Sequence, residues 1–107
     1  MTNSNMIDQV IDSGAPISAE INGAQLSRSG SRAQTTQISV QVIPEGSGSF
    51  EVHLEGSVNT RSGRAFSKIG EWTQSDDVLL SVFPVSQGCN YRLRHVSGIA
   101  CRVLLTG

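Results

Sequence analysis

Residues 77–107 read DVLLSVFPVSQGCNYRLRHVSGIACRVLLTG, and this stretch decides the fold class. Apolar side chains alternate with others through residues 78–83, 91–95 and 99–106, which is the period-two pattern of β-strands. The links between these three runs are short and contain glycine, as in antiparallel hairpins. The stretch therefore predicts three strands of an antiparallel meander, with the strand over residues 99–106 in the core.

The last connection allows a prediction of register. A two-residue loop at Ser97 and Gly98 would pair Leu93 with Arg102 and mix core with solvent residues on one face. A three-residue loop pairs Leu93 with Cys101 and leaves the arginines of both strands on the opposite face. Because a slip of one residue moves every side chain to the other face, we expect the three-residue loop. Gly98 would supply the positive φ that this loop requires.

Similar alternating runs occur earlier, over residues 37–43 and 50–54, and turn-forming segments separate them. Seven or eight short strands with frequent turns are typical of a β-sandwich. We therefore expect an all-β antiparallel sandwich, of jelly-roll or immunoglobulin-like layout, as a single domain over residues 17–107. The side chains expected to point inward are Ile38, Val40, Val42, Phe50, Val52, Leu54, Val78, Leu80, Val82, Leu93, Cys101, Val103 and Leu105.

A faint internal repeat supports the same fold class. Residues 42–44 (Val-Ile-Pro), followed by Gly48, match residues 82–84 (Val-Phe-Pro), followed by Gly88. Each copy follows an alternating run and precedes a run that begins near an aromatic residue. The repeat predicts two similar hairpins, one in each layer of the sandwich.

Residues 1–16 are polar apart from Ile7, Val10 and Ile11, whose spacing fits one turn of a helix. A helix this short is marginal in water by itself, and it forms only if it docks on this domain or on a neighbour. We expect residues 1–16 to form a flexible arm that becomes ordered on a neighbouring protein. Ile7, Val10 and Ile11 are therefore candidate partner-binding residues.

Composition and charge exclude several classes of function. The 107 residues carry a net charge of −1, so no overall field attracts nucleic acid or an anionic membrane. The apolar runs are too short to cross a bilayer, and the first ten residues lack the layout of a signal peptide. We expect synthesis in a cytosolic redox environment. In the three-residue register Cys89 lies four residues along the strand from the partner of Cys101, roughly 13 Å away at about 3.3 Å per residue, so both cysteines should be free thiols.

No sequence motif carries chemistry. The chain contains no Gly-x-Ser-x-Gly, His-x-x-x-His or Cys-x-x-Cys pattern. His53 lies on the polar side of its run with Glu51 and Glu55, which is typical of a solvated face. His95 lies on the apolar side near a predicted hairpin end, where a hydrogen-bonded histidine is expected. We expect no catalytic residues, no metal site and no cofactor.

Two loops of similar type carry the remaining candidates. Arg28 and Arg32 lie on one loop built on an Arg-Ser-Gly sequence, and Arg61 and Arg64 lie on another. Arginine suits bidentate recognition of carboxylates, so these loops are interpreted as a basic rim that meets an acidic protein surface. Trp72 is a further candidate, together with Tyr91, for a sugar-binding platform, although packing in the core is the favoured interpretation of both.

The second half of the chain resembles small virion proteins of tailed bacteriophages. The similarity is carried by FEVHLEGS at residues 50–57, KIGEWTQSDDVLLSVFPV at residues 68–85 and YRLRHVSGIACRVLLTG at residues 91–107. This resemblance implies a compact sandwich without enzyme activity. It predicts a capsid decoration or cement protein in the virion, which binds the major capsid protein or other virion proteins as a homo-oligomer.

Two further hypotheses remain open. The chain is either a carbohydrate- or receptor-binding module of a phage tail or fibre, or an unrelated intracellular β-sandwich adaptor. The few aromatic residues, five in the whole chain, disfavour a sugar-binding module, because such modules expose aromatic platforms.

Overall fold

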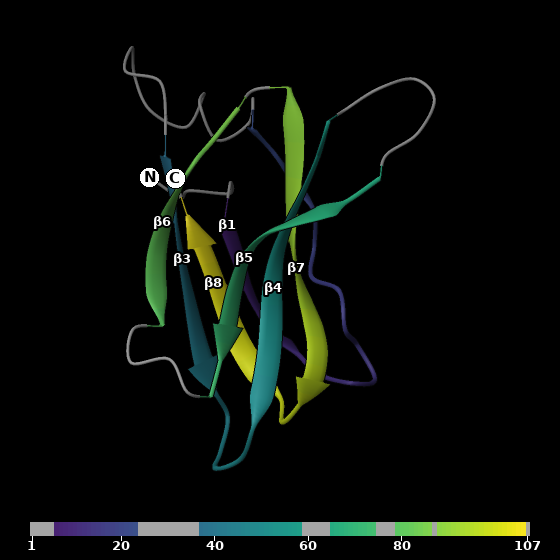
Figure 1. Ribbon diagram of the computed structural model, residues 1–107, viewed down its shortest axis with the longest axis vertical. Helices are drawn as coiled ribbons and strands as arrows, with labels where there is room; N and C mark the ends of the chain where they lie inside the picture. The colour runs from purple at the N-terminus through teal and green to yellow at the C-terminus, as the bar shows by residue number, and fades with distance from the viewer. Residues whose placement is uncertain (1–5, 24–36, 59–64, 75–78, 87, 107) are drawn as a thin grey trace.

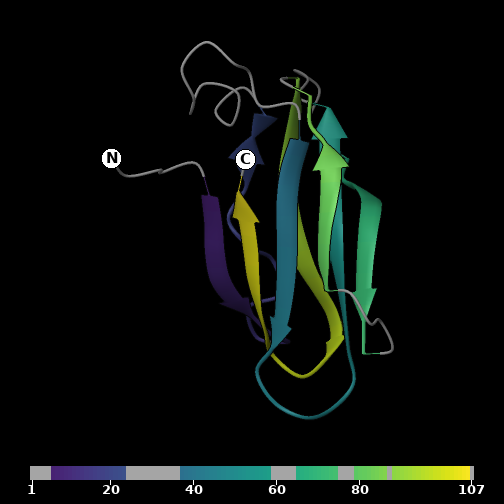
Figure 2. The same ribbon diagram turned by 90° about the vertical axis from the view of Figure 1, so that its left-hand side faces the viewer.

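The protein is an eight-stranded sandwich over the residues that the computed structural model describes, which are 6–23, 37–58, 65–74, 79–86 and 88–106 (Figure 1). The strands are β1 Met6–Ile11, β2 Ile21–Asn22, β3 Gln37–Pro44, β4 Phe50–Val58, β5 Ser67–Thr73, β6 Leu80–Pro84, β7 Cys89–Gly98 and β8 Cys101–Thr106. They form two four-stranded antiparallel sheets, with strand orders β1-β8-β3-β6 and β2-β7-β4-β5 (Figures 1 and 2). The predicted all-β sandwich is confirmed.

The order of the strands identifies the layout as a jelly roll. Consecutive strands lie in different sheets at every step except β4 to β5, which pair directly. Two such interleaved four-stranded sheets are the arrangement of an eight-stranded jelly roll. Of the two layouts that the sequence left open, the structure therefore has the jelly roll.

The predicted C-terminal meander is wrong. β7 pairs with β4 and β2, whereas β8 lies between β1 and β3 in the other sheet. Leu93 and Cys101 both point inward as predicted, but they do so from opposite sheets. Alternation fixes which side of a strand is apolar, and it does not distinguish a hairpin from a connection that crosses the core.

Gly98 has the predicted positive φ, 91°, at this crossing. A Cβ on Gly98 would come within 2.0 Å of the carbonyl oxygen of Ser49, because β7 and the start of β4 approach closely there. The same crossing separates the arginines that were expected on one face. Arg92 and Arg94 belong to the β2-β7-β4-β5 sheet, whereas Arg102 belongs to the other.

Strand β6 has the opposite phase to the one predicted. Leu80 and Val82 are 52% and 54% exposed, whereas Ser81 and Phe83 lie opposite the buried residues Val40 and Ile38 of β3. Residues 79–83 contain apolar side chains in both phases, so alternation alone cannot choose between them. Burying the larger Phe83 ring decides the phase, because apolar burial scales with area.

Residues 6–11 form β1 and not the helical turn that their spacing predicted. β1 pairs with β8 along its whole length, from Met6 with Thr106 to Ile11 with Cys101. Ile7 and Ile11 are buried in the core, while Val10 points outward and is 47% exposed. The spacing 7, 10, 11 fits a helix, but a free hydrogen-bonding edge on β8 favours an added strand. Residues 6–11 therefore belong to the sandwich and not to a separate arm.

The core closes between the two sheets. Every inward residue predicted on β3, β4, β7 and β8 is buried; Val78 lies outside the described residues. Five further apolar side chains, which were not in the inward set named above, are also buried: Ile7, Ile11, Ile21, Trp72 and Tyr91. Core packing is thus the confirmed interpretation of Trp72 and Tyr91. Both cysteines are free thiols, as predicted, with Cys101 buried and Cys89 partly so.

The internal repeat corresponds to two similar crossings of the core. β3 runs to Pro44 and crosses to β4, and β6 runs to Pro84 and crosses to β7. β3 pairs antiparallel with β6 in one sheet, and β4 pairs antiparallel with β7 in the other. Each copy therefore spans both layers, and the prediction of one hairpin in each layer is wrong.

Candidate functional site

The predicted partner-binding residues do not form one site within the described part of the chain. Arg28, Arg32, Arg61 and Arg64 lie outside the described residues. Ile7 and Ile11 fill the core, and only Val10 reaches the surface. The candidate sites are instead the outer faces of the two sheets, which differ in character.

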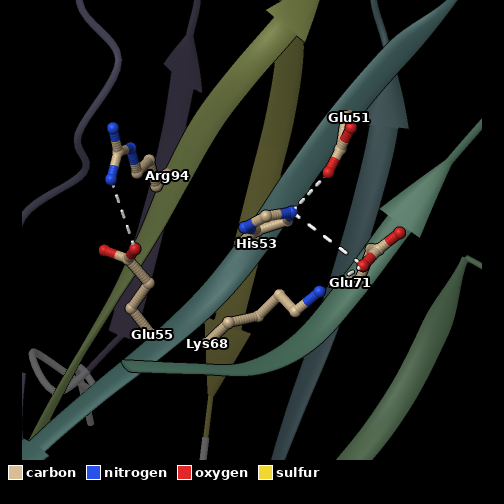
Figure 3. A network of polar contacts seen from close by, with 6 residues as sticks. All are labelled: Glu51, His53, Glu55, Lys68, Glu71 and Arg94. Atoms are coloured by element: carbon tan, nitrogen blue, oxygen red, sulfur yellow. Dashed lines mark hydrogen bonds and ion pairs between the residues drawn. The ribbon is translucent and has the colours of Figure 1, made fainter. Parts of the chain in front are cut away.

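The outer face of the β2-β7-β4-β5 sheet is charged, and we call it the charged face. It carries a network of polar contacts from three neighbouring strands (Figure 3). Its titratable side chains are Glu51, His53, Glu55, Lys68, Glu71, Arg92 and Arg94.

His53 is central to one half of this network. Its Nε2 lies 2.6 Å from Oε2 of Glu51 and 4.0 Å from Oε1 of Glu71. Lys68 donates a hydrogen bond of 2.7 Å to the same oxygen of Glu71. This hydrogen bond lowers the pKa of the Glu71 carboxyl below its usual value, and the charges of Lys68 and His53 add to the effect. Glu71 therefore remains ionised over the physiological range.

Glu55 is central to the other half. Its side chain is only 7% exposed, and Nε of Arg92 lies 2.9 Å from its Oε1. Arg94 approaches the second oxygen at 3.6 Å, as Figure 3 shows. The guanidinium of Arg92 also lies 3.8 Å from the centre of the Phe66 ring. A nearly buried carboxylate is thus neutralised by two arginines, an arrangement that holds β4 against β7.

The outer face of the β1-β8-β3-β6 sheet has few charges, and we call it the apolar face. Three cross-strand rows make up this face: Met6, Thr106, Ser39 and Val82; Asp8, Leu104, Gln41 and Leu80; and Val10, Arg102 and Ile43. Five of these side chains are large, apolar and exposed: Met6, Val10, Ile43, Leu80 and Val82. A hollow of about 260 Å³ lies between the first two rows, and its lining includes Met6, Ser39 and Thr106 of the first and Gln41, Leu80 and Leu104 of the second.

The two charges of the apolar face neutralise each other. Arg102 donates from Nε and Nη2 to the two carboxylate oxygens of Asp8, at 2.8 and 2.9 Å. This contact lowers the pKa of Asp8 and raises that of Arg102, with the hydrogen bond as the largest cause in each case. The pair joins β1 to β8. The charge of Glu45, directly after the end of β3, also raises the pKa of Arg102 by a smaller amount.

A sugar-binding platform at Trp72 and Tyr91 is excluded by their burial. Trp72 is 1% exposed and meets the Phe83 ring edge-on at 5.7 Å between centroids. Tyr91 is 4% exposed, and its hydroxyl accepts a hydrogen bond from the backbone of Ser86. His95 is also buried, with Nε2 2.8 Å from the carbonyl oxygen of Ile99, as expected for a hydrogen-bonded histidine.

Comparisons with protein-family models, with curated proteins and with solved structures found no match to this chain. Within the described segments, no helix is long and apolar enough to cross a membrane.

Sequence reasoning missed Glu71 and the apolar face. Alternation along β4 placed Glu51 and His53 on one side, but the pairing of His53 with Glu71 depends on the register between β4 and β5. That register shifts at a bulge between Leu54 and Glu55, which no sequence pattern indicated. The apolar face was missed because Leu80 and Val82 were assigned to the core.

Proposed function

We propose that this protein is a non-enzymatic structural component of a bacteriophage particle, a decoration or cement protein that binds the head shell. The observation that carries this proposal is the apolar face. Its five exposed aliphatic side chains are spread over β1, β3 and β6. Large exposed apolar surfaces often mark interaction sites, so a partner surface is expected to cover this face.

The chemistry of the face favours a protein as that partner. Its hydrogen-bonding groups, Ser39, Gln41 and Thr106, are uncharged, and the charges within its three rows, Asp8 and Arg102, are paired with each other. Nucleic acid or an anionic membrane would require unpaired cations, and a sugar would require exposed aromatic rings. Aliphatic groups with a few neutral polar groups match the centre of a protein–protein interface.

The fold and the resemblance add support by analogy. Eight-stranded jelly rolls occur in viral capsid proteins and in lectins, although a fold alone does not establish a function. The similarity of residues 50–107 to phage virion proteins favours the first of these groups. The proposed partner is the major capsid protein, with many copies of this chain bound around the particle.

The mode of attachment differs from the one predicted from the sequence. Because β1 is part of the sheet, Met6 and Val10 are held in place by their strand before any partner binds. A preformed face loses little conformational entropy on binding, whereas an arm must become ordered residue by residue. Docking through a rigid sheet is therefore the favoured mechanism.

The test uses particles of the phage that encodes this chain, produced without it. Purified protein is added back, and bound copies are counted by quantitative mass spectrometry after sedimentation. The test variant, Leu80→Lys with Val82→Lys, places two ammonium groups on exposed positions of edge strand β6, where lysine is well tolerated. The control, Val58→Lys, makes the same change at a 61% exposed position of the other sheet.

The wild type and Val58→Lys should load onto the heads, and the double variant should bind at least about tenfold more weakly because buried ammonium groups are costly. Equal loading of the double variant would exclude the apolar face as the contact. Absence of the protein from native particles would exclude the function. The proposal would also be overturned if the apolar face bound a second copy of this chain and not the shell. In that case the wild type would form a dimer and the double variant would not.

A further inference from the structure

The charged face places three metal-ligating side chains together. Glu51 and His53 are two residues apart on β4, so their side chains point to the same side. Glu71 on β5 pairs directly with His53. Figure 3 shows the two carboxylates lying on either side of Nε2 of the imidazole. The backbone register therefore brings one nitrogen and two oxygen donors to one point of the sheet.

The distances fit a site that closes around an ion with small movements. One donor atom from each of Glu51, His53 and Glu71 lies within 4.8 Å of the others. Ligands about 2.0–2.2 Å from a tetrahedral zinc ion are about 3.3–3.5 Å apart. Glu51 would move outward from 2.6 Å, and Glu71 inward from 4.0 Å, relative to Nε2 of His53.

The three side chains differ in how freely they can move to bind an ion. The side chain of His53 is only 17% exposed, so the strands hold the imidazole in place. The side chains of Glu51 and Glu71 are 34% and 41% exposed and can adjust by rotation. The imidazole nitrogen of His53 is therefore held in place, and the carboxylates of Glu51 and Glu71 can rotate to bind an ion that enters from solvent.

We propose that Glu51, His53 and Glu71 form a binding site for a divalent transition-metal ion, with Zn²⁺ as the best fit and water completing the coordination. Imidazole together with carboxylate selects zinc and its neighbours, whereas Mg²⁺ prefers oxygen ligands alone. The two carboxylates balance the charge of the ion. Glu55 is not a ligand, because Arg92 and Arg94 already bind its carboxylate.

Two existing contacts must be exchanged when the ion binds. With Nε2 protonated, His53 donates to Glu51, so this hydrogen bond must break and the proton must shift to Nδ1 before Nε2 can hold the ion. Lys68 must leave Oε1 of Glu71, where its ammonium now lies at 2.7 Å. Because a proton and the ion compete for the imidazole, binding should weaken at acidic pH, as for other histidine ligands. The bound ion would join edge strand β5 to β4 and should raise the melting temperature.

The test is a zinc titration of the untagged protein in the Cys89→Ser background, which removes the more exposed thiol as a competing ligand. Calorimetry measures affinity and stoichiometry, and the imidazole resonances of His53 and His95 report the ligand. The test variants are His53→Gln and Glu71→Gln. Glu71→Gln changes an exposed side chain and should fold normally. Lys68→Gln is the matched control, because it removes a contact of Glu71 without removing a donor.

The expected result is one Zn²⁺ per chain, a shifted His53 resonance and an unchanged His95 resonance. His53→Gln and Glu71→Gln should each weaken binding by at least about tenfold, and Lys68→Gln should bind at least as tightly as its parent. Mg²⁺ should not compete. The proposal is overturned if no binding occurs up to about 1 mM Zn²⁺, which corresponds to about −4 kcal/mol. It is also overturned if both glutamine variants bind like their parent.

Discussion

The ring of Phe83 on β6 lies against Gly70 on β5, across the gap between the two sheets. A Cβ built on Gly70 would come within 2.6 Å of Cζ of Phe83, so the ring occupies the space that a side chain would need. The same ring meets Trp72 edge-on. This contact explains why β6 turns Phe83 inward and leaves Leu80 and Val82 in solvent.

The first prediction concerns this contact. Gly70→Ala should lower the free energy of unfolding by about 1–3 kcal/mol, because the new methyl group overpacks the Phe83 ring. Gly46→Ala is the matched control, since a Cβ there meets nothing within 4 Å. Urea unfolding curves of both variants measure the difference. Equal stability of Gly70→Ala and the wild type would mean that Phe83 does not lie against β5.

The second prediction separates a core strand from an arm at the N-terminus. Ile11→Ala should lower the stability by about 2–5 kcal/mol, because it leaves a cavity where Ile11 is 1% exposed. Val10→Ala, at a position 47% exposed, should change it by about 0.5 kcal/mol or less. Thermal unfolding of the free protein provides the measurement. If the two variants are equally stable, residues 6–11 do not pack on the sandwich.

The third prediction concerns the two thiols. Burial raises the pKa of the Cys101 thiol to about 11, and a nearby Glu45 charge adds a smaller effect. Cys101 should therefore resist iodoacetamide near neutral pH, whereas the less buried Cys89 should react. Mass spectrometry should show one modified cysteine in the native protein and two in the unfolded protein. Rapid modification of both native thiols would contradict the burial of Cys101.

The raised pKa of Cys101 also predicts the direction of a pH effect. Between pH 9.0, the ordinary pKa of a thiol, and about pH 11, the folded protein keeps the proton on Cys101 whereas the unfolded protein loses it. Stability from this group is therefore complete below about pH 9 and decreases as the pH rises towards 11. The loss of stability between about pH 9 and 11 should be smaller in Cys101→Ala than in the wild type. Comparing the two proteins cancels the contributions of other groups, such as Tyr91, because both proteins contain them.

The fourth prediction concerns the ion pair between Asp8 and Arg102. The lowered pKa of Asp8 means that its contribution to stability is present above the ordinary value of 3.8 and decreases as the pH falls below it. Because the pair is exposed, salt should weaken it. The protection of the β1 amides against hydrogen exchange, relative to their intrinsic exchange rates, should decrease in acid in the wild type. Asp8→Asn should remove this pH dependence while leaving the exchange of β4 unchanged.

The inward faces of β3, β4, β7 and β8 were predictable from the sequence, because side chains alternate along any strand wherever its partners lie. Leu93 and Cys101 are examples: both were assigned correctly to the core, although their strands were assigned wrongly to one hairpin. The positive φ at Gly98 was predictable for a similar local reason, since few other residues adopt it.

The candidate sites were less predictable than the core. Alternation in the sequence predicts that Glu51 and His53 lie on the same side of one strand. Glu71 lies beside them only because of the register of β5 against β4. Leu80 and Val82 belong to the apolar face only because Phe83 takes the place in the core that they were expected to fill. Both results depend on contacts between residues that are distant in the chain.

The sequence by itself determined the all-β class and the apolar side of most strands, since these follow from composition and from local alternation. Only the tertiary structure decided the sheet that each strand joins, the phase of β6 and the inclusion of β1. A strand offers hydrogen-bonding groups along both edges and identical backbone chemistry to every partner. The choice among partners therefore depends on which arrangement buries side chains such as Ile11 and Phe83, and that burial is a property of the whole fold.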